Sequence, residues 1–252
     1  MKVTIRLDGV FKGVYQPYKW LFVFPFMVLS TLVHGVVCMV VVLFFGSDAG
    51  NLVAVSWSRV ACVLVPIRVK ISGRNNYSRS NSYVVVANHQ SMVDIPVIHG
   101  WLGLRIKWVM KKELKKIPIF GPACQSLGCI YIDRSNSGAA LKSMEDAKKR
   151  LFDREKIIGG SAVLFFPEGT RSRDGRVLAF KKGAFRFAMD AGLPILPITV
   201  RNSRQILPSD SLDLTPGEVE IQVHPAVDLT GCTIEDLNDI VFRVRQTIEE
   251  SL

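Results

Sequence analysis

The chain has 252 residues and a formal net charge of +10 at pH 7, from 32 Lys and Arg against 22 Asp and Glu. This length predicts one α/β domain with an added segment. The five cysteines contain no CxxC pair, which excludes a disulfide framework and a cysteine-based zinc site and agrees with a reducing compartment. A basic chain suits either nucleic acid or an anionic lipid surface. Because no nucleic-acid motif is present, we expect no nucleic-acid partner.

The apolar residues are concentrated near the N-terminus. Mean hydropathy is +0.25, and no charged residue occurs between Trp20 and Ser47. About 20 apolar residues are enough to cross a bilayer. A shorter apolar stretch over 52–67 contains an arginine and a proline, which favours an interfacial or re-entrant helix. The alternatives are a buried core helix and a signal peptide. A signal peptide fits poorly because the charged lead before Trp20 and the apolar run after it are both too long.

Basic residues, among them Lys19 and Arg68, flank this apolar region on both sides. Positive charge marks the cytoplasmic side of a membrane, so both flanks are expected there. Residues 20–67 are therefore predicted to form a re-entrant hairpin or two spans, not a single crossing. We predict an N-terminal membrane-anchoring helical motif over 1–70 and an α/β catalytic domain over 71–252, associated with the cytoplasmic face of a membrane.

The remainder of the chain alternates between strand-like and helix-like runs. The predicted strands are 83–87, 129–132, 162–166, 195–200 and 219–223, and the predicted helices are 92–101, 137–150 and 183–191. This alternation predicts an α/β fold with a mixed, largely parallel central sheet flanked by helices, carrying the N-terminal membrane-associated helical motif. Ligands of such sheets bind where the strands end, so the residues that follow each strand are the candidates for function.

The first predicted strand runs into Asn88–Asp94, NHQSMVD. Ser91 can cap a helix that begins at Met92, with Asp94 as the acidic partner of a capping box. If the chain turns between them, Asp94 can instead accept a hydrogen bond from His89 and leave its other ring nitrogen free to take a proton. A metal site needs a further ligand, and the other histidines show no matching spacing. A serine nucleophile is not predicted because no GxSxG occurs.

The third predicted strand, residues 162–166, is followed by PEGTRS, and the whole stretch 162–172 reads AVLFFPEGTRS. Gly169 permits a tight turn, Thr170 offers a hydroxyl, and Arg171 offers a planar set of donors that suits phosphate. Most of the other cations nearby are interpreted as a solvated basic surface: Arg173, Arg176, Lys181, Lys182, Arg186, Lys107, Lys111, Lys112, Lys115 and Lys116. A general base, a phosphate pocket and an apolar anchor together indicate acyl transfer to a lipid hydroxyl.

Two of these stretches, NHQSMVD and FPEGTRS, resemble the paired signatures of the glycerolipid acyltransferases. The stretch KKELKKIPIFGPACQSLGCIYIDR, residues 111–134, is similar to a second block of that family, and LPILPITV is similar to a fourth. Within the family, the chain most resembles the bacterial 1-acyl-sn-glycerol-3-phosphate acyltransferases. The N-terminal third carries no motif of the family.

The resemblance implies a role for each matching residue. His89 is expected to be the general base, oriented by Asp94, that activates the sn-2 hydroxyl of lysophosphatidic acid for attack on acyl-CoA or acyl-acyl carrier protein, forming phosphatidic acid. The residues expected at the substrates are Glu168, Gly169, Thr170 and Arg171 on the glycerol phosphate, Lys111 and Arg134 on the phosphate or the donor, and Asn88 and Ser91 around the base. No metal and no bound cofactor is expected. The bacterial inner membrane is the expected location.

Three other functions fit parts of the same pattern. The first keeps the family and changes the acceptor to lyso-ornithine lipid, another lysophospholipid or glycerol-3-phosphate. A protein that only docks on anionic lipid would need the basic surface but not the His-x4-Asp spacing. A hydrolase would pass the acyl group to water instead of to a lipid.

Overall fold

A computed structural model describes residues 15–133, 138, 143–146 and 160–252. Its centre is a seven-stranded sheet in the order β1-β7-β6-β2-β5-β3-β4. Every neighbouring pair is parallel except β6 and β7, which confirms the predicted mixed, largely parallel sheet. The strands are β1 Ile67–Ser72, β2 Tyr83–Ala87, β3 Arg105–Lys111, β4 Ile130–Ile132, β5 Ser161–Phe165, β6 Ile195–Arg201 and β7 Gly217–Val223.

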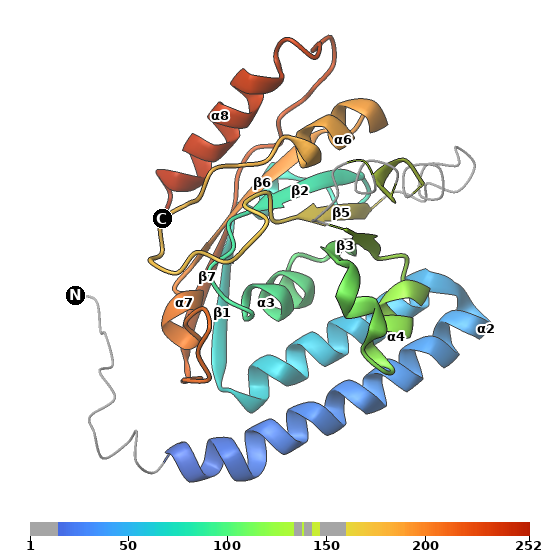
Figure 1. Cartoon of the computed structure of the whole chain (residues 1–252), viewed down its shortest axis with the longest axis vertical. Helices are drawn as coiled ribbons and strands as arrows, with labels where there is room; N and C mark the ends of the chain where they lie inside the picture. Colours follow the sequence, from blue (N-terminus) through green and yellow to red (C-terminus); the bar gives the residue numbers. More distant parts are fainter. Residues whose placement is uncertain (1–14, 134–137, 139–142, 147–159) are drawn as a thin grey trace.

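The central strand β2 is buried on both faces, as a run of β-branched valines in a parallel sheet predicts. Val85 and Ala87 pack on one side, against helix α3 and the N-terminal helices. Val84 and Val86 pack on the other side, against α6 and α8. Figure 1 shows helices covering both faces of the sheet. The α-helices whose bounds lie within the described residues of the globular part are α3 Asp94–Trp101, α4 Phe120–Ser126, α6 Gly183–Ala191, α7 Ser203–Ile206 and α8 Leu237–Glu249.

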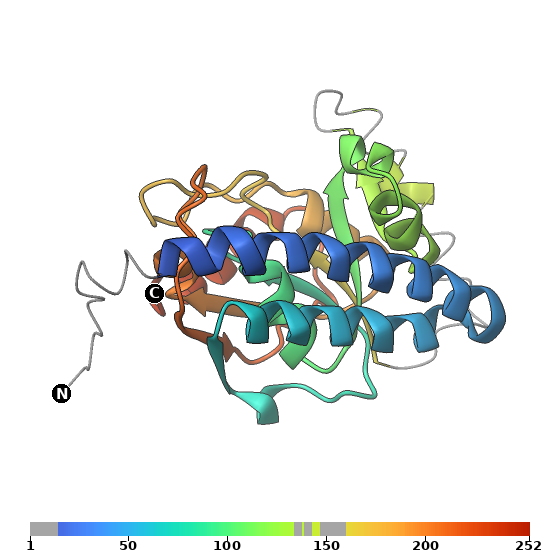
Figure 2. The same ribbon diagram turned by 90° about the horizontal axis from the view of Figure 1, so that it is seen from below.

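The N-terminal apolar region forms a helical hairpin. Helix α2, Phe24–Leu64, is broken at Gly46, whose φ of 83° lies in the left-handed region that glycine adopts freely. A π-helical turn over Lys19–Val23 precedes it. The two arms run side by side across the globular part (Figures 1 and 2). This geometry agrees with the expected hairpin or pair of spans and differs from one continuous crossing.

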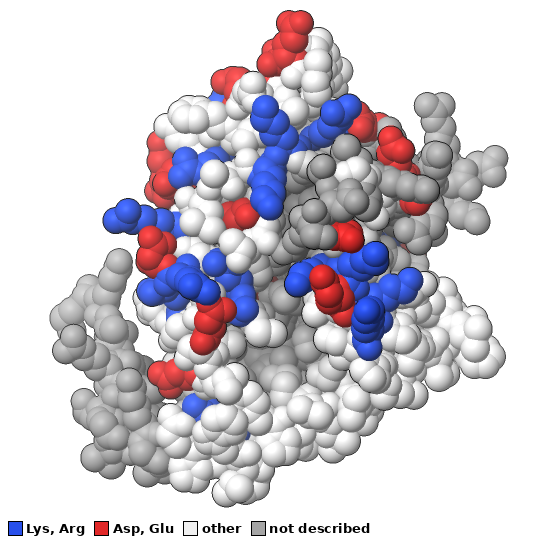
Figure 3. Space-filling model, viewed as in Figure 1, with Lys and Arg blue, Asp and Glu red and all other residues white. Residues whose placement is uncertain are grey.

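The hairpin has one face against the globular part and one face exposed. Asp48, near the bend, pairs with Arg105 of β3 at 3.2 Å, and Arg59 of the second arm donates to the carbonyl of Gly100 at 3.1 Å. Most of the large exposed apolar side chains belong to the hairpin, and only 11% of its most apolar stretch is buried. Charged side chains are correspondingly sparse over that end of the molecule (Figure 3).

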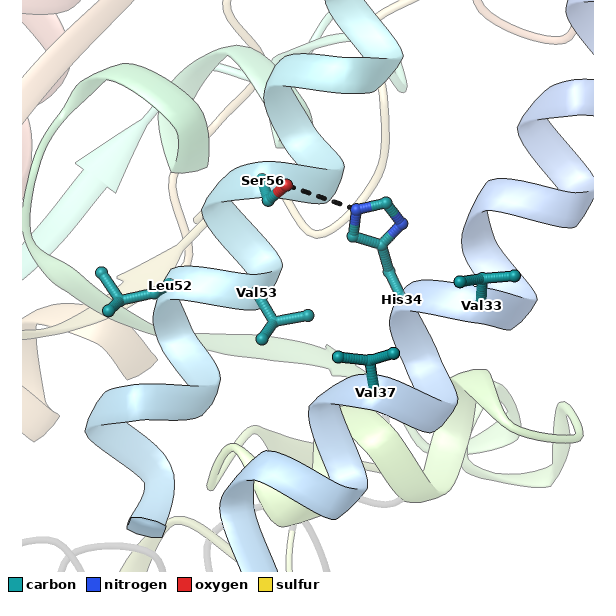
Figure 4. A pocket seen from close by; sticks show the side chains of 6 residues that line it. All are labelled: Val33, His34, Val37, Leu52, Val53 and Ser56. Carbon is teal, nitrogen blue, oxygen red and sulfur yellow. Dashed lines mark hydrogen bonds between the residues drawn. The ribbon is translucent and has the colours of Figure 1, made fainter.

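Polar side chains join the two arms. Trp57 donates its indole N–H to the hydroxyl of Thr31 at 3.0 Å. The imidazole Nδ1 of His34 lies 2.8 Å from the carbonyl of Ser30 in the same arm. Its Nε2 lies 3.4 Å from the hydroxyl of Ser56 in the other arm. His34 and Ser56 also line a cavity of about 320 Å³ between the arms, whose other walls are aliphatic (Figure 4). Hydrogen bonds of this kind hold helices together where water is scarce.

The predicted strands that lie in the described residues are found in the structure with small shifts of their bounds. Strands β1 and β3 and helices α4, α7 and α8 were not predicted, and the boundary expected after residue 70 falls within β1. The helix predicted over 92–101 is α3, which begins at Asp94 because residues 92 and 93 form a turn. The helix predicted over 137–150 lies largely outside the described residues.

Candidate active site

His89 and Asp94 are in contact. His89 follows the carboxyl end of β2, and the chain turns before α3 begins at Asp94. The Nδ1 atom of His89 lies 2.8 Å from Oδ2 of Asp94. The same oxygen accepts the backbone N–H groups of Gln90 at 2.8 Å and Ser91 at 2.9 Å. Three donors therefore converge on one carboxylate oxygen, which fixes its position.

This contact sets the chemical form of the histidine. Because Asp94 accepts from Nδ1, the neutral imidazole carries its proton there and keeps a lone pair on Nε2. The Asp94 side chain is fully buried, whereas 15% of the His89 side chain is exposed. The His89 ring stacks on Phe166 with centroids 3.8 Å apart and planes 8° apart. The result is a rigidly held imidazole with one ring nitrogen available to accept a proton.

Glu168 is a buried carboxylic acid that contacts the backbone of His89. Only 5% of Glu168 is exposed. Its Oε1 accepts the backbone N–H of His89 at 2.6 Å, and its Oε2 accepts that of Leu178 at 2.9 Å. Burial raises the pKa of Glu168 to about 7, although these two N–H donors favour the carboxylate. In the structure this residue positions the turn that carries His89.

Asn88 and Ser91 are both buried and hold the same turn from the other side. The amide of Asn88 donates to the carbonyl of Val200 at 2.9 Å and accepts its N–H at 2.8 Å, which joins the end of β2 to β6. The hydroxyl of Ser91 donates to the carbonyl of Leu207 at 2.8 Å and accepts the N–H of Val93 at 3.1 Å. With the bond from Ser91 N–H to Asp94, these contacts form a variant of the predicted capping box, one turn before α3.

The basic turn after β5 lies beside the histidine turn because β2 and β5 are parallel neighbours. The N–H of Ser172 donates to the carbonyl of His89 at 2.8 Å. Gly169 has a φ of 75°, and Thr170 is exposed. Arg171 is 29% exposed and lies 3.6 Å from the carboxylate of Asp210. The two sequence signatures thus form one site at the carboxyl edge of the sheet.

The last two predicted residues are Lys111 and Arg134. Lys111 ends β3, is exposed, and pairs with Glu113 at 3.5 Å. Arg134 lies outside the described residues. Lys and Arg side chains gather on the face shown in Figure 3, with acidic side chains among them. Within the described part of the chain, no three His, Cys, Asp or Glu side chains are grouped to hold a metal ion.

Sequence reasoning missed three residues at this site. Phe166 stacks on His89, Gln90 donates its side-chain amide to the carbonyl of Gly175 at 2.7 Å, and Asp210 pairs with Arg171. Phe166 and Gln90 lie inside the two signature stretches, which is a signal that could have found them. Asp210 lies in a loop far along the chain, and no local pattern marks it. The whole arrangement can remove a proton from a hydroxyl held beside an anion site.

Comparison with known proteins links this arrangement to acyl transfer. A family model described as Acyltransferase matches residues 68–201. The 1-acyl-sn-glycerol-3-phosphate acyltransferase alpha of Homo sapiens is 34% identical over 185 residues, which are 73% of this chain and 64% of that protein. The 1-acyl-sn-glycerol-3-phosphate acyltransferase of Limnanthes douglasii is 27% identical over 248 residues, which are 97% of this chain and 85% of that protein. The chain thus spans less than two thirds of the human relative.

A solved structure is similar over nearly the full length of both chains. The crystal structure of the 1-acyl-sn-glycerophosphate (LPA) acyltransferase PlsC from Thermotoga maritima superposes with a TM-score of 0.78 at 26% identity, covering 95% of this chain and 97% of that chain. This coverage extends beyond the globular part, so the N-terminal helices belong to the shared fold.

Proposed function

The chain belongs to the acyltransferase family, and we propose that it transfers a fatty acyl group to the sn-2 hydroxyl of 1-acyl-sn-glycerol-3-phosphate, forming phosphatidic acid. The acyl donor is acyl-CoA or acyl-acyl carrier protein. The contact between His89 Nδ1 and Asp94 Oδ2 at 2.8 Å carries this proposal, because it leaves Nε2 as a base beside the turn that contains Arg171.

The proposed reaction begins with the acceptor hydroxyl. Its proton passes to Nε2 of His89, and its oxygen forms a bond to the thioester carbonyl carbon. Asp94 stabilises the imidazolium formed in this step. The carbon–sulfur bond then breaks, and the imidazolium returns the proton to the departing thiolate. A general base typically contributes ~10²–10⁴-fold to such a reaction, and the thioester is already activated, so the scheme uses no metal and no bound cofactor.

The basic turn is proposed to hold the acceptor's phosphate. Gly169 lets the backbone approach a ligand closely, Thr170 offers a hydroxyl, and the guanidinium of Arg171 offers two parallel donors. Glu168 supports this turn and the histidine turn together through its two backbone contacts. Holding the hydroxyl near Nε2 contributes to the rate because it replaces an encounter in solution with a fixed geometry.

The hairpin is proposed to insert into the cytoplasmic leaflet of the membrane. Its exposed face carries Leu43, Phe44 and Phe45, which are 78%, 71% and 74% exposed. Its other face is held against the globular part by Asp48 and Arg59. A hairpin that lies along the domain cannot cross the bilayer without drawing the domain in, so insertion from one side fits the structure better than two spans.

The test is thiol release from acyl-CoA by detergent-purified protein, with and without lysophosphatidic acid. Release should depend on the lysolipid, and His89→Ala should reduce it by roughly a hundredfold or more. Arg171→Ala should raise the KM for the acceptor, whereas Lys182→Ala, which removes an exposed cation nearby, should not. Unchanged activity in His89→Ala would refute the mechanism. Release of free fatty acid without consumption of lysolipid would identify a hydrolase. If another acceptor gave a higher kcat/KM, that acceptor would replace lysophosphatidic acid as the proposed substrate.

A further inference from the structure

We propose that Trp108 is a positioning residue for His89, that it acts through Phe166, and that His99 holds it in place. This inference rests on the proposed role of His89 as the general base. Phe166 stacks on the imidazole of His89. Trp108 contacts Phe166 in turn, with ring centroids 5.8 Å apart and planes tilted by 32°. The base is thus the last of a row of rings that begins in the core.

The pairing of β3 with β5 places Trp108 beside Phe166. Trp108 is aligned with Leu164 in the parallel register of these strands. Side chains alternate along a strand, so the next position on the same side after Leu164 is that of Phe166. All three side chains pack in the same core, and Trp108 is 7% exposed. Trp108 therefore supports Phe166 from the interior of the protein.

His99 fixes the indole of Trp108. The indole N–H donates to Nδ1 of His99 at 2.9 Å, and His99 is 4% exposed. Burial lowers the pKa of His99 to about 4, so its imidazole is neutral at pH 7 and Nδ1 can accept this bond. The Nε2 of His99 is buried without a hydrogen-bond partner among the described residues. The bond to Trp108 is accordingly the hydrogen bond that orients both rings.

Helix α3 supplies two constraints on the base. Its first residue, Asp94, binds Nδ1 of His89, and His99 lies later on the same helix. A hydrogen bond at Nδ1 fixes one nitrogen but allows the imidazole to tilt about the line of that bond. A ring stacked on its face resists the tilt, provided that the stacked ring is itself held. Trp108 holds Phe166 and so helps to aim Nε2 of His89 at the acceptor hydroxyl.

The first experiment replaces Trp108 with Phe, which removes the indole N–H and shortens the side chain. A displacement of about 1 Å at a reacting group can cost about 100-fold in rate. A tilted imidazole is a smaller fault, so the kcat for thiol release at saturating lysophosphatidic acid should fall about tenfold. The KM for lysophosphatidic acid should stay within twofold, because the basic turn that contains Arg171 is unchanged.

The matched control is Trp101→Phe. Trp101 also lies in this region, at the end of α3, but its ring contact is with the guanidinium of Arg59. The same substitution there should leave kcat within twofold. A purely structural role of Trp108 would lower Tm without a change in the kcat of the folded enzyme. An unchanged kcat in Trp108→Phe would overturn the inference, and so would an equal loss in Trp101→Phe.

Two variants of His99 test the hydrogen bond separately. His99→Asn places a carbonyl oxygen near the position of Nδ1 and can still accept the indole N–H. His99→Leu fills a similar space without an acceptor. We expect kcat to stay within about threefold in His99→Asn and to fall about tenfold in His99→Leu. Equal kcat values in these two variants would refute the role of His99, and this comparison decides the matter if Trp108→Phe does not fold.

A double-mutant cycle tests whether Trp108 acts through Phe166. Phe166→Leu removes the stacked ring and should itself lower kcat. If Trp108 acts through that ring, adding Trp108→Phe to Phe166→Leu should change kcat by less than twofold, although the same substitution costs about tenfold in wild type. A further tenfold loss in the double variant would show that the two residues act independently and would overturn the inference.

The failure of this inference is distinguishable from failure of the proposed function. If wild type transfers to lysophosphatidic acid and His89→Ala abolishes transfer, the proposed function stands. Normal kcat values in Trp108→Phe and His99→Leu would then refute only the positioning role. If His89→Ala keeps the wild-type rate, there is no base to position and both proposals fail.

Discussion

Replacing Asp94 with Asn should separate the charge of this side chain from its role in orienting His89. In wild type, Oδ2 receives three N–H donors, whereas Oδ1 is buried without a hydrogen-bond partner among the described residues. An amide therefore has one favourable orientation, with its oxygen where the three donors converge and its NH₂ group at the position of Oδ1. The imidazole then keeps its tautomer and orientation but loses the negative charge beside it.

The size of the effect follows from the distance. The imidazolium formed during proton transfer and the Asp94 carboxylate have charge centres about 4 Å apart, and with an effective dielectric constant near 20 their attraction is about 4 kcal/mol. At 1.36 kcal/mol per factor of ten, kcat should fall about 10³-fold. Asp94→Ala also removes the three hydrogen bonds, so it should lower the free energy of unfolding by an additional ~2–4 kcal/mol.

The assay is thiol release at saturating lysophosphatidic acid, together with chemical denaturation of each variant. Asp94→Asn should lose activity while keeping most of its stability, and Asp94→Ala should lose both. Retention of more than a tenth of kcat in Asp94→Asn would show that the carboxylate charge contributes little. Equal destabilisation of the two variants would refute the predicted orientation of the amide.

Further predictions concern the residues that support His89 and the pH dependence of stability. Asn88→Ala should lower the free energy of unfolding by about 2–4 kcal/mol in chemical denaturation, because it leaves the buried N–H and C=O groups of Val200 unpaired; a change under 1 kcal/mol would contradict this. The pKa of Glu168 is raised to about 7, so the folded state binds its proton more tightly and Glu168 reduces stability as pH rises from about 4.5 to 7. The pKa of His99 is lowered to about 4, chiefly by burial, so His99 increases stability as pH rises from about 4 to 6.5. Glu168→Gln should therefore show a Tm that rises more steeply between pH 5 and 6.5 than that of wild type, and parallel Tm curves would contradict the assignment.

The central strands and the histidine–aspartate pair were predictable because their signals are local. Strand β2 is a continuous run of β-branched residues, and His89 and Asp94 lie within one turn of each other. Strand β3 was missed because its lysines were interpreted as a solvated surface. Lys107 is in fact buried and donates to the carbonyl of Leu127 at 2.7 Å.

Contacts between distant segments were beyond local reasoning. Glu168 was expected to contact the substrate. In the structure its carboxylate accepts the backbone N–H of His89, and this contact depends on the parallel pairing of β2 with β5. The pairing of Asp210 with Arg171 depends on a loop between α7 and β7. Strand β1 alternates between more and less buried residues, as a strand should, but its basic residues were counted with the flank of the membrane segment.

The edge position of β1 has a consequence for synthesis of the protein. β1 directly follows the hairpin, and its partner in the sheet is β7, Gly217–Val223. At about 5–20 residues per second, roughly 7–30 s of translation separate the two strands. During that interval the hairpin has left the ribosome, while the globular part on which its inner face packs, chiefly through α3 and α4, is incomplete. Its apolar outer face and its uncovered inner face are then both open to solvent, so the nascent chain should reach the bilayer or a chaperone before the globular part folds.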